Sequence, residues 1–154
     1  MAENGTTAGV FRSPALRSVE VSMTGMSELP LRKSEDVVRM RQAVRERSIA
    51  LGFGLVDQTK LVTAASELAR NALVHGGGGH VEVVEMTNGA RRGLQLSFVD
   101  QGPGIEDIQL ALKDGYTSRG GLGLGLGGAR RLANEFNIES TPGRGTRVTI
   151  VRWL

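Results

Sequence analysis

Two stretches of alternating apolar residues, joined by an Asn-Gly pair, constrain the fold of this chain more than any other feature. HVEVVEM (80–86) and GLQLSFVD (93–100) alternate as half-buried β-strands do. Asn88–Gly89 between them is the strongest short-range signal for a tight hairpin turn. The sequence therefore predicts two strands that pair in the antiparallel direction, and the rest of the fold has to be built around them.

Two helices are expected before this hairpin. The first is predicted to be capped by Ser34 and to end near Gly52, and the second to be capped by Asp57 and to reach about His75. Their predicted core positions are Val37, Met40, Val44 and Leu51 in the first helix and Leu61, Ala65, Leu68 and Ala72 in the second.

After the hairpin, the sequence predicts a short helix at 107–113, a helix at 129–136 and two closing strands, NIEST and RVTIVRWL, joined by a turn at 142–145. Before the helices, LPLRK (29–33) is predicted as an edge strand. Residues 1–28 are predicted as a mostly flexible lead-in that holds a short strand in VEVSM, and 29–154 as the folded domain. The expected fold class is an α/β two-layer sandwich, with helices on one face of a mixed, mainly antiparallel sheet.

Composition excludes several classes of protein. The 154 residues suit one domain, and the formal net charge of +3, without interleaved aromatic residues, does not indicate nucleic-acid binding. With no cysteine, the chain has no disulfides or cysteine-based zinc sites, which suits a reducing compartment. No apolar run is long enough to cross a membrane, and residues 1–18 do not resemble a signal peptide. We therefore expect a cytoplasmic protein.

The stretch VDQGPGI (99–105) ends the second hairpin strand with a carboxylate. Asp100 shares its parity with Leu94, Leu96 and Phe98, so it is expected to point toward the core, where a carboxylate is costly unless it receives hydrogen bonds. Either the following amides supply them in a local turn, or a ligand such as the exocyclic amine of a purine does. The residues alone leave both alternatives open.

Two further features could bind a ligand or take part in a reaction: a polar pair on the second predicted helix and a cluster of glycines. Glu67 and Asn71 lie one helical turn apart, where they could hold a metal or accept a hydroxyl proton, although Glu67 could equally pair with Arg70. The glycine cluster at 120–128 precedes a helix N-terminus that favours anionic oxygens, or else it is a plain connector. His75 and His80 flank GGGG, but two histidines without a third ligand make a poor metal site.

The order of these motifs resembles the GHKL ATPase superfamily, whose members share the Bergerat fold. The stretches around them are similar to the stand-alone serine/threonine kinases of the anti-sigma type, and most of all to the RsbT-type switch kinases of the bacterial stressosome. The resemblance covers about residues 29–154. The motifs, in chain order, are E-x-x-x-N (Glu67, Asn71), D-x-G-x-G (Asp100, Gly102, Gly104), G-x-G-x-G (Gly121, Gly123, Gly125) and G-x-G-T (Gly143, Gly145, Thr146).

The resemblance implies a role for each motif residue. Asp100 would bind the adenine amino group of ATP, with Thr146 joining through water and Ile105 packing against the base. Asn71 would coordinate Mg²⁺, and Glu67 would be the general base. The remaining implied nucleotide-binding residues are Gly102 and Gly104 beside the base, and Arg119, Gly121, Leu122, Gly123, Leu124 and Gly125 at the phosphates.

The implied function is that of an ATP-dependent serine/threonine kinase that switches partners. Its substrate would be a STAS-domain protein, and after phosphorylating it the kinase would be released to activate a PP2C-type phosphatase. Two alternatives remain open: an anti-sigma factor that sequesters a sigma subunit, and a nucleotide-gated binding module without turnover. The sequence does not determine whether the chain is a monomer or a dimer.

Overall fold

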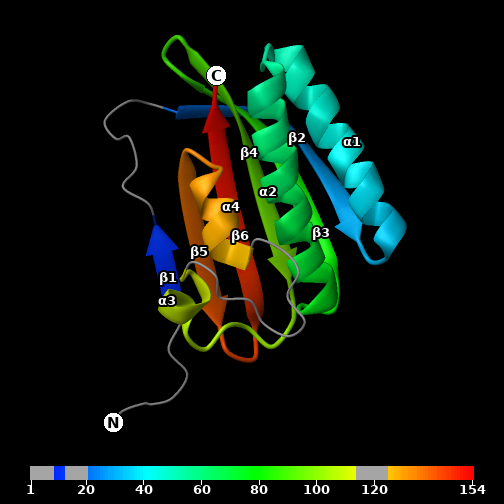
Figure 1. Cartoon of the computed structure of the whole chain (residues 1–154), viewed down its shortest axis with the longest axis vertical. Helices are drawn as coiled ribbons and strands as arrows, with labels where there is room; N and C mark the ends of the chain where they lie inside the picture. The colour runs from blue at the N-terminus through cyan, green and yellow to red at the C-terminus, as the bar shows by residue number, and fades with distance from the viewer. Residues whose placement is uncertain (1–8, 13–20, 114–124) are drawn as a thin grey trace.

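The computed structural model describes residues 9–12, 21–113 and 125–154. Strands and helices follow one another from the N-terminal blue to the C-terminal red in Figure 1. The strands are β1 (Gly9–Arg12), β2 (Val21–Leu31), β3 (Gly79–Asn88), β4 (Arg91–Asp100), β5 (Glu135–Thr141) and β6 (Gly145–Trp153). The helices are α1 (Ser34–Leu51), α2 (Leu55–Val74), α3 (Ile108–Ala111) and α4 (Gly125–Arg131).

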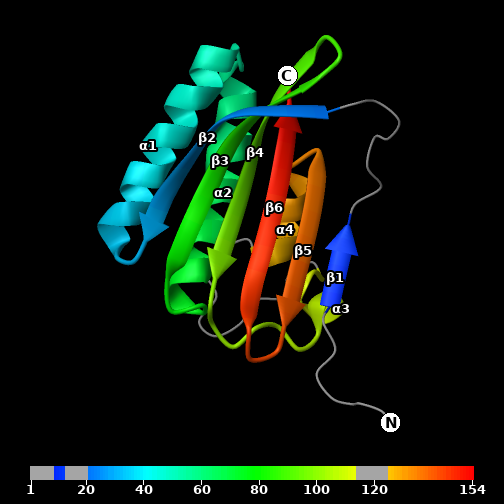
Figure 2. The same ribbon diagram turned by 180° about the vertical axis from the view of Figure 1, so that it is seen from behind.

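The six strands form one sheet in the order β1-β5-β6-β4-β3-β2. Every strand pair in the described part of the chain is antiparallel, so the parallel component of the expected mixed sheet does not occur there. The helices lie in front of the sheet in Figure 1 and behind it in Figure 2, so the described helices cover one face only. The predicted two-layer α/β sandwich is confirmed.

The hairpin that the sequence predicted lies in the interior of this sheet, between β6 and β2. Strands β3 and β4 pair along their whole length, from Gly79 opposite Asp100 to Asn88 opposite Arg91. Alternate residues of β4, Leu94, Leu96 and Phe98, are buried under the helices. The alternation in the sequence thus identified the helix-covered face correctly.

The two long helices end where expected but begin differently. Ser34 is the first residue of α1 rather than its cap, and the Asp36 carboxylate accepts hydrogen bonds from the backbone N–H groups of Arg32 and Lys33 at 2.8 and 3.1 Å. Helix α2 begins at Leu55, after Gly54. The predicted caps are therefore wrong, because the helices extend one and three residues further toward the N-terminus, with Lys33 and Gly54 at the N-cap positions.

Asp57 has a different partner from the one predicted. Its carboxylate accepts a hydrogen bond of 2.7 Å from Arg152 of β6, which also donates to the carbonyl of Leu132. A tertiary contact between residues 95 positions apart replaces the local capping interaction.

The helix predicted at 129–136 is wrong in its boundaries. Helix α4 ends at Arg131, and Glu135 and Phe136 begin β5, where they pair with Val151 and Ile150 of β6. Phe136 is 1% exposed within the core. Cross-strand pairing and burial of this ring override the local helical pattern of ARRLANEF.

Parts of the predicted lead-in belong to the sheet. Gly9–Arg12 forms β1 and pairs with β5 at one edge. The strand predicted at LPLRK begins earlier, at Val21, and ends at Leu31, before Arg32 and Lys33. The predicted edge position of that strand is confirmed, since β2 is the last strand of the sheet. The sheet therefore includes residues on both sides of the boundary expected at residue 29.

None of the helices in the described ranges has both the length and the hydrophobicity needed to cross a bilayer.

Candidate functional site

Asp100 lies at the end of β4, half-buried on the side of the sheet that the helices cover. Its Oδ1 accepts a hydrogen bond of 2.9 Å from the backbone N–H of Gly102. Burial raises the pKa of the Asp100 carboxyl, while hydrogen bonds from the backbone N–H groups of Gly102 and Thr146 act in the opposite direction. The local turn that the sequence left open is thus present. It does not saturate a carboxylate, which can accept about four hydrogen bonds.

The end of helix α2 contacts this carboxylate directly. A Cβ atom at Gly76 would overlap the Asp100 side chain, so the backbone of Gly76 lies against the carboxyl group. The backbone carbonyl of Asn71 accepts hydrogen bonds from the N–H groups of His75 and Gly76, at 2.9 and 3.1 Å. The helix that carries Glu67 and Asn71 therefore ends at Asp100, and the structure brings the first two motifs together.

Glu67 is 8% exposed on α2. Its Oε1 lies 3.5 Å from a guanidinium nitrogen of Arg70, whose side chain is 58% exposed. The ion pair between Glu67 and Arg70, which the sequence allowed as a purely structural role for Glu67, is therefore present. Asn71 lies one turn further along the helix and is partly exposed.

The loop after Asp100 is fixed onto the turn between β5 and β6. The N–H of Ile105 donates to the hydroxyl of Ser140 at 2.8 Å, and the N–H of Gly143 donates to the carbonyl of Pro103 at 2.7 Å. The hydroxyl groups of Ser140 and Thr146 are 2.8 Å apart and share a hydrogen bond. The second and fourth motifs, some 40 residues apart in the chain, thus form one unit.

Ser140 is a site residue that the sequence reasoning missed. It is 2% exposed, and its hydroxyl oxygen also lies 3.1 Å from the carbonyl oxygen of Gly145. The signal was its parity: Ser140 follows Phe136 and Ile138 at the buried positions of β5. A buried hydroxyl needs hydrogen-bond partners, and here these are the Ile105 N–H, the Gly145 carbonyl and the Thr146 hydroxyl.

The glycines of these two turns are explained by close packing of the backbone. A Cβ atom at Gly104 would lie 2.5 Å from the carbonyl oxygen of Thr141, and one at Gly145 would overlap the carbonyl oxygen of Asp100. Both residues also have positive φ, at 81° and 98°. The chain itself thus requires glycine at these positions.

The third motif is described only at its end. Arg119, Gly121, Leu122, Gly123 and Leu124 lie outside the described residues. Gly125 is the first residue of α4.

A hollow of about 210 Å³ lies at this end of the sheet. Its lining includes Asp100, Ser140 and Thr146, and also Val99, Glu139 and Arg147, which alternate with them along β4, β5 and β6.

Similarity to known proteins agrees with this arrangement. Residues 56–153 match the family described as histidine kinase-, DNA gyrase B- and HSP90-like ATPase. The chain is 43% identical over 119 residues to the serine/threonine-protein kinase RsbT of Bacillus subtilis, an alignment that covers 77% of this chain and 90% of that protein. It is 28% identical over 138 residues to the anti-sigma F factor of a Thermoanaerobacter species, covering 85% of this chain and 95% of that protein.

Among solved structures, the chain resembles the RsbU and RsbW domains of a Mycobacterium tuberculosis protein. The TM-score is 0.55 at 20% identity, and the match covers 84% of this chain and 32% of that one. The chain thus spans about a third of that solved chain, and the likeness supports the fold alone.

We expect Asp100→Asn to preserve or raise the stability of the free protein. Because burial raises the pKa of Asp100 in the folded state, ionisation at neutral pH opposes folding, and an amide removes this penalty while still accepting from Gly102. The difference in melting temperature between the variant and the wild type should therefore move in favour of the variant as pH rises above the ordinary carboxyl range. Thermal melts of both proteins at pH 4 and pH 7 measure this difference. A difference that moves in favour of the wild type between pH 4 and pH 7 contradicts the prediction.

Ser140→Ala should loosen the two turns. The substitution leaves the Ile105 N–H without its acceptor, at a cost of about 1–3 kcal/mol in unfolding free energy. Hydrogen exchange at the Ile105 amide, followed by NMR, should become faster. Ser48→Ala is the matched control, since Ser48 is also buried, in α1, and its hydroxyl donates to the Arg45 carbonyl of the same helix. Unchanged exchange at Ile105 in the Ser140 variant would show that the hydroxyl does not hold the loop.

Proposed function

The chain belongs to the family of histidine kinase-, DNA gyrase B- and HSP90-like ATPases, and on this premise we propose that it is an ATP-dependent serine/threonine protein kinase that acts by switching partners. The observation that carries the nucleotide part is the position of Asp100, a half-buried carboxylate enclosed by the end of α2 and the turn between β5 and β6. The kinase part is supported by 43% identity to RsbT over most of both chains.

Asp100 recognises the adenine ring in this proposal. Its carboxylate accepts the exocyclic amino group, which supplies a donor for the acceptor capacity that the local turn leaves unused. Thr146, held beside Asp100 by the strand register and by Ser140, binds through water. Ile105, fixed by its bond to Ser140, packs against the base together with the backbone of Gly102 and Gly104.

The third motif would hold the phosphates, as the resemblance implies. Its contributions would be the backbone amides of Gly121, Leu122, Gly123, Leu124 and Gly125 and the side chain of Arg119. Asn71 offers an amide oxygen, a ligand type that Mg²⁺ accepts, at the turn of α2 that leads to Asp100. Bound Mg²⁺ supplies neutralisation of phosphate charge, which phosphoryl transfer requires.

Glu67 accepts the proton of the attacking hydroxyl group of the protein substrate. The oxygen of that serine or threonine then forms a bond to the terminal phosphorus of ATP, and ADP leaves with the electrons of the broken bond. Arg70 faces the Glu67 carboxylate at 3.5 Å, so the guanidinium has to share or release it when the hydroxyl group arrives. Its exposed position allows this movement.

The proposed protein substrate is a STAS-domain scaffold or antagonist protein. After transfer the kinase is released and binds and activates a PP2C-type phosphatase in a cytoplasmic stress or signalling pathway. The second candidate is an anti-sigma factor kinase, which the 28% identity to anti-sigma F factors favours. A binding module without turnover is the third, but it has no use for a carboxylate placed like Glu67.

Glu67→Gln is expected to abolish phosphate transfer and to leave ATP affinity within about twofold, because a general base acts only in the chemical step.

Asp100→Asn is expected to weaken ATP binding by about tenfold or more, since one lost hydrogen bond to a charged group costs about 1.5–3 kcal/mol. Transfer of label from ATP to a STAS-domain protein and calorimetric titration with ATP measure the two effects.

The matched control is Glu46→Gln, on the exposed side of α1. It should change neither quantity. Equal loss of ATP binding in the Glu67 and Asp100 variants would contradict the division of roles. ATP binding without transfer by the wild type would refute the kinase and favour the binding module.

Affinity capture should separate the two kinase candidates. The immobilised chain is expected to retain a STAS-domain protein and a PP2C-type phosphatase, each supplied pure, and not a purified sigma factor. Retention of the sigma factor in an ATP-dependent manner would favour the anti-sigma reading instead.

A further inference from the structure

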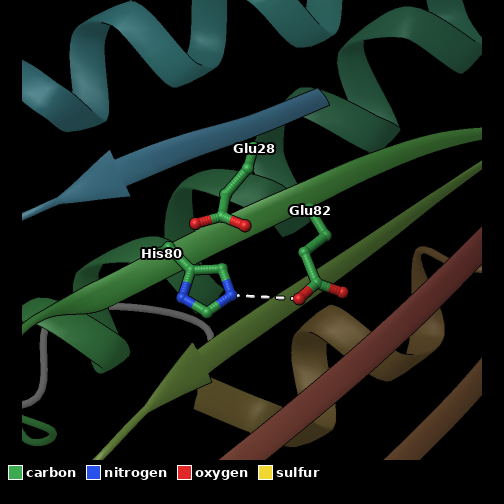
Figure 3. Close-up of side chains that lie close together, drawn as sticks. All are labelled: Glu28, His80 and Glu82. Carbon is green, nitrogen blue, oxygen red and sulfur yellow. Dashed lines mark hydrogen bonds and ion pairs between the residues drawn. The ribbon is translucent and has the colours of Figure 1, made fainter. Parts of the chain in front are cut away.

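Three side chains that can bind a metal meet on the face of the sheet that the described helices leave open. Val81 and Val83 of β3 are buried under the helices, so their neighbours His80 and Glu82 point to the opposite face. Glu28 of β2 lies directly opposite Glu82 across the strand pair and joins them. Figure 3 shows the three side chains grouped together, with a dashed line from the His80 ring to the Glu82 carboxylate.

The geometry of this cluster, Glu28–His80–Glu82, is close to that of a metal site. The Nε2 atom of His80 lies 3.0 Å from Oε2 of Glu82. One ligand atom from each of the three residues lies within 4.8 Å of the other two. Since the three residues lie on paired strands, their backbone positions are fixed by the sheet.

The charges of the cluster also favour a cation. Two glutamates directly opposite each other on neighbouring strands repel, which destabilises the pair. Arg147 of β6 neutralises only Glu82, through hydrogen bonds of 3.0 and 3.2 Å to its two oxygens. Glu28 thus adds a second carboxylate beside Glu82.

We propose that Glu28, His80 and Glu82 form a binding site for Zn²⁺. The donor set of one imidazole nitrogen and two carboxylate oxygens suits zinc, which takes three protein ligands and a water in open sites. Mg²⁺ and Ca²⁺ prefer oxygen ligands alone, so the imidazole selects against them. The two carboxylates of the cluster outnumber the one guanidinium bonded to it, that of Arg147, which also favours a cation.

Small movements complete the coordination. Zinc–nitrogen and zinc–oxygen bonds of about 2.0–2.2 Å at tetrahedral angles separate two ligand atoms by about 3.4 Å, so the 3.0 Å between His80 and Glu82 has to widen slightly. The present contact with Glu82 is a hydrogen bond from Nε2–H, so zinc takes the place of this hydrogen bond and binds the tautomer that carries its proton on Nδ1. Arg147 stays on Glu82 and orients that carboxylate, as outer partners of metal ligands do.

The proposed site differs from the pair of histidines that flank the GGGG segment, His75 and His80, which alone are too poor in ligands to hold a metal. The strand register supplies the missing ligands instead, from β2 and from the residue two positions along β3. His75 is the C-cap of α2 and takes no part.

Zinc titration of the full chain tests the proposal. The protein is stripped with a chelator and titrated with Zn²⁺, without nucleotide, in competition with a chromophoric zinc indicator. We expect one zinc ion per chain, and affinity at least about tenfold weaker in His80→Ala and Glu28→Gln. His75→Ala, which removes the only other histidine of the chain, and Glu46→Gln are the controls and should bind as the wild type does.

Thermal stability gives a second readout that does not depend on the indicator. Zinc should raise the melting temperature of the wild type and of His75→Ala but not of His80→Ala, whose fold is checked by circular dichroism. Mg²⁺ in place of Zn²⁺ should raise none of them. Wild-type zinc affinity in His80→Ala, loss of binding in His75→Ala, or no binding by the wild type would each overturn the proposal.

Discussion

The half-buried carboxylate of Asp100 is the constraint on which this end of the molecule depends. Burial raises the pKa of this carboxyl group because it disfavours the charged form. The backbone N–H groups of Gly102 and Thr146 donate hydrogen bonds that offset this effect. Convergence of so much backbone excludes side chains: a Cβ atom at Gly76 would overlap the carboxylate itself, and one at Gly145 the carbonyl of Asp100. The glycine-rich motifs thus have a structural cause in this chain, separate from any ligand, and the site is built before a ligand arrives.

The sequence predicted what local patterns control. Alternation in β3 and β4 and the turn at Asn88–Gly89 were sufficient for the central hairpin, because a register slip of one residue would expose Leu94, Leu96 and Phe98. Where a distant partner competes with the local pattern, the prediction failed. Asp57 looked like a helix cap but binds Arg152, and Phe136 looked helical but fills the core from a strand.

The candidate site divides in the same way. Asp100, Glu67 and Asn71 were recognisable because each belongs to a short motif, and the structure brings Asp100 to the end of the helix that carries the other two. Ser140 belongs to no motif, and its role follows from contacts to Ile105 and Thr146 that exist only once two turns are folded together. Likewise Glu28 and His80 are 52 residues apart, and only the pairing of β2 with β3 makes them neighbours.

The two sites lie on neighbouring strands, β4 and β3, and use opposite faces of the sheet. Gly79 pairs with Asp100, and the next pair along is His80 with Val99, so the strand alternation that turns Asp100 toward the helices turns His80 to the open face. A cation that joins β2 to β3 there would restrain the end of β3, whose Gly79 fits closely against Val99 and Asp100. The backbone that positions the Asp100 carboxylate would then be held from both faces of the sheet.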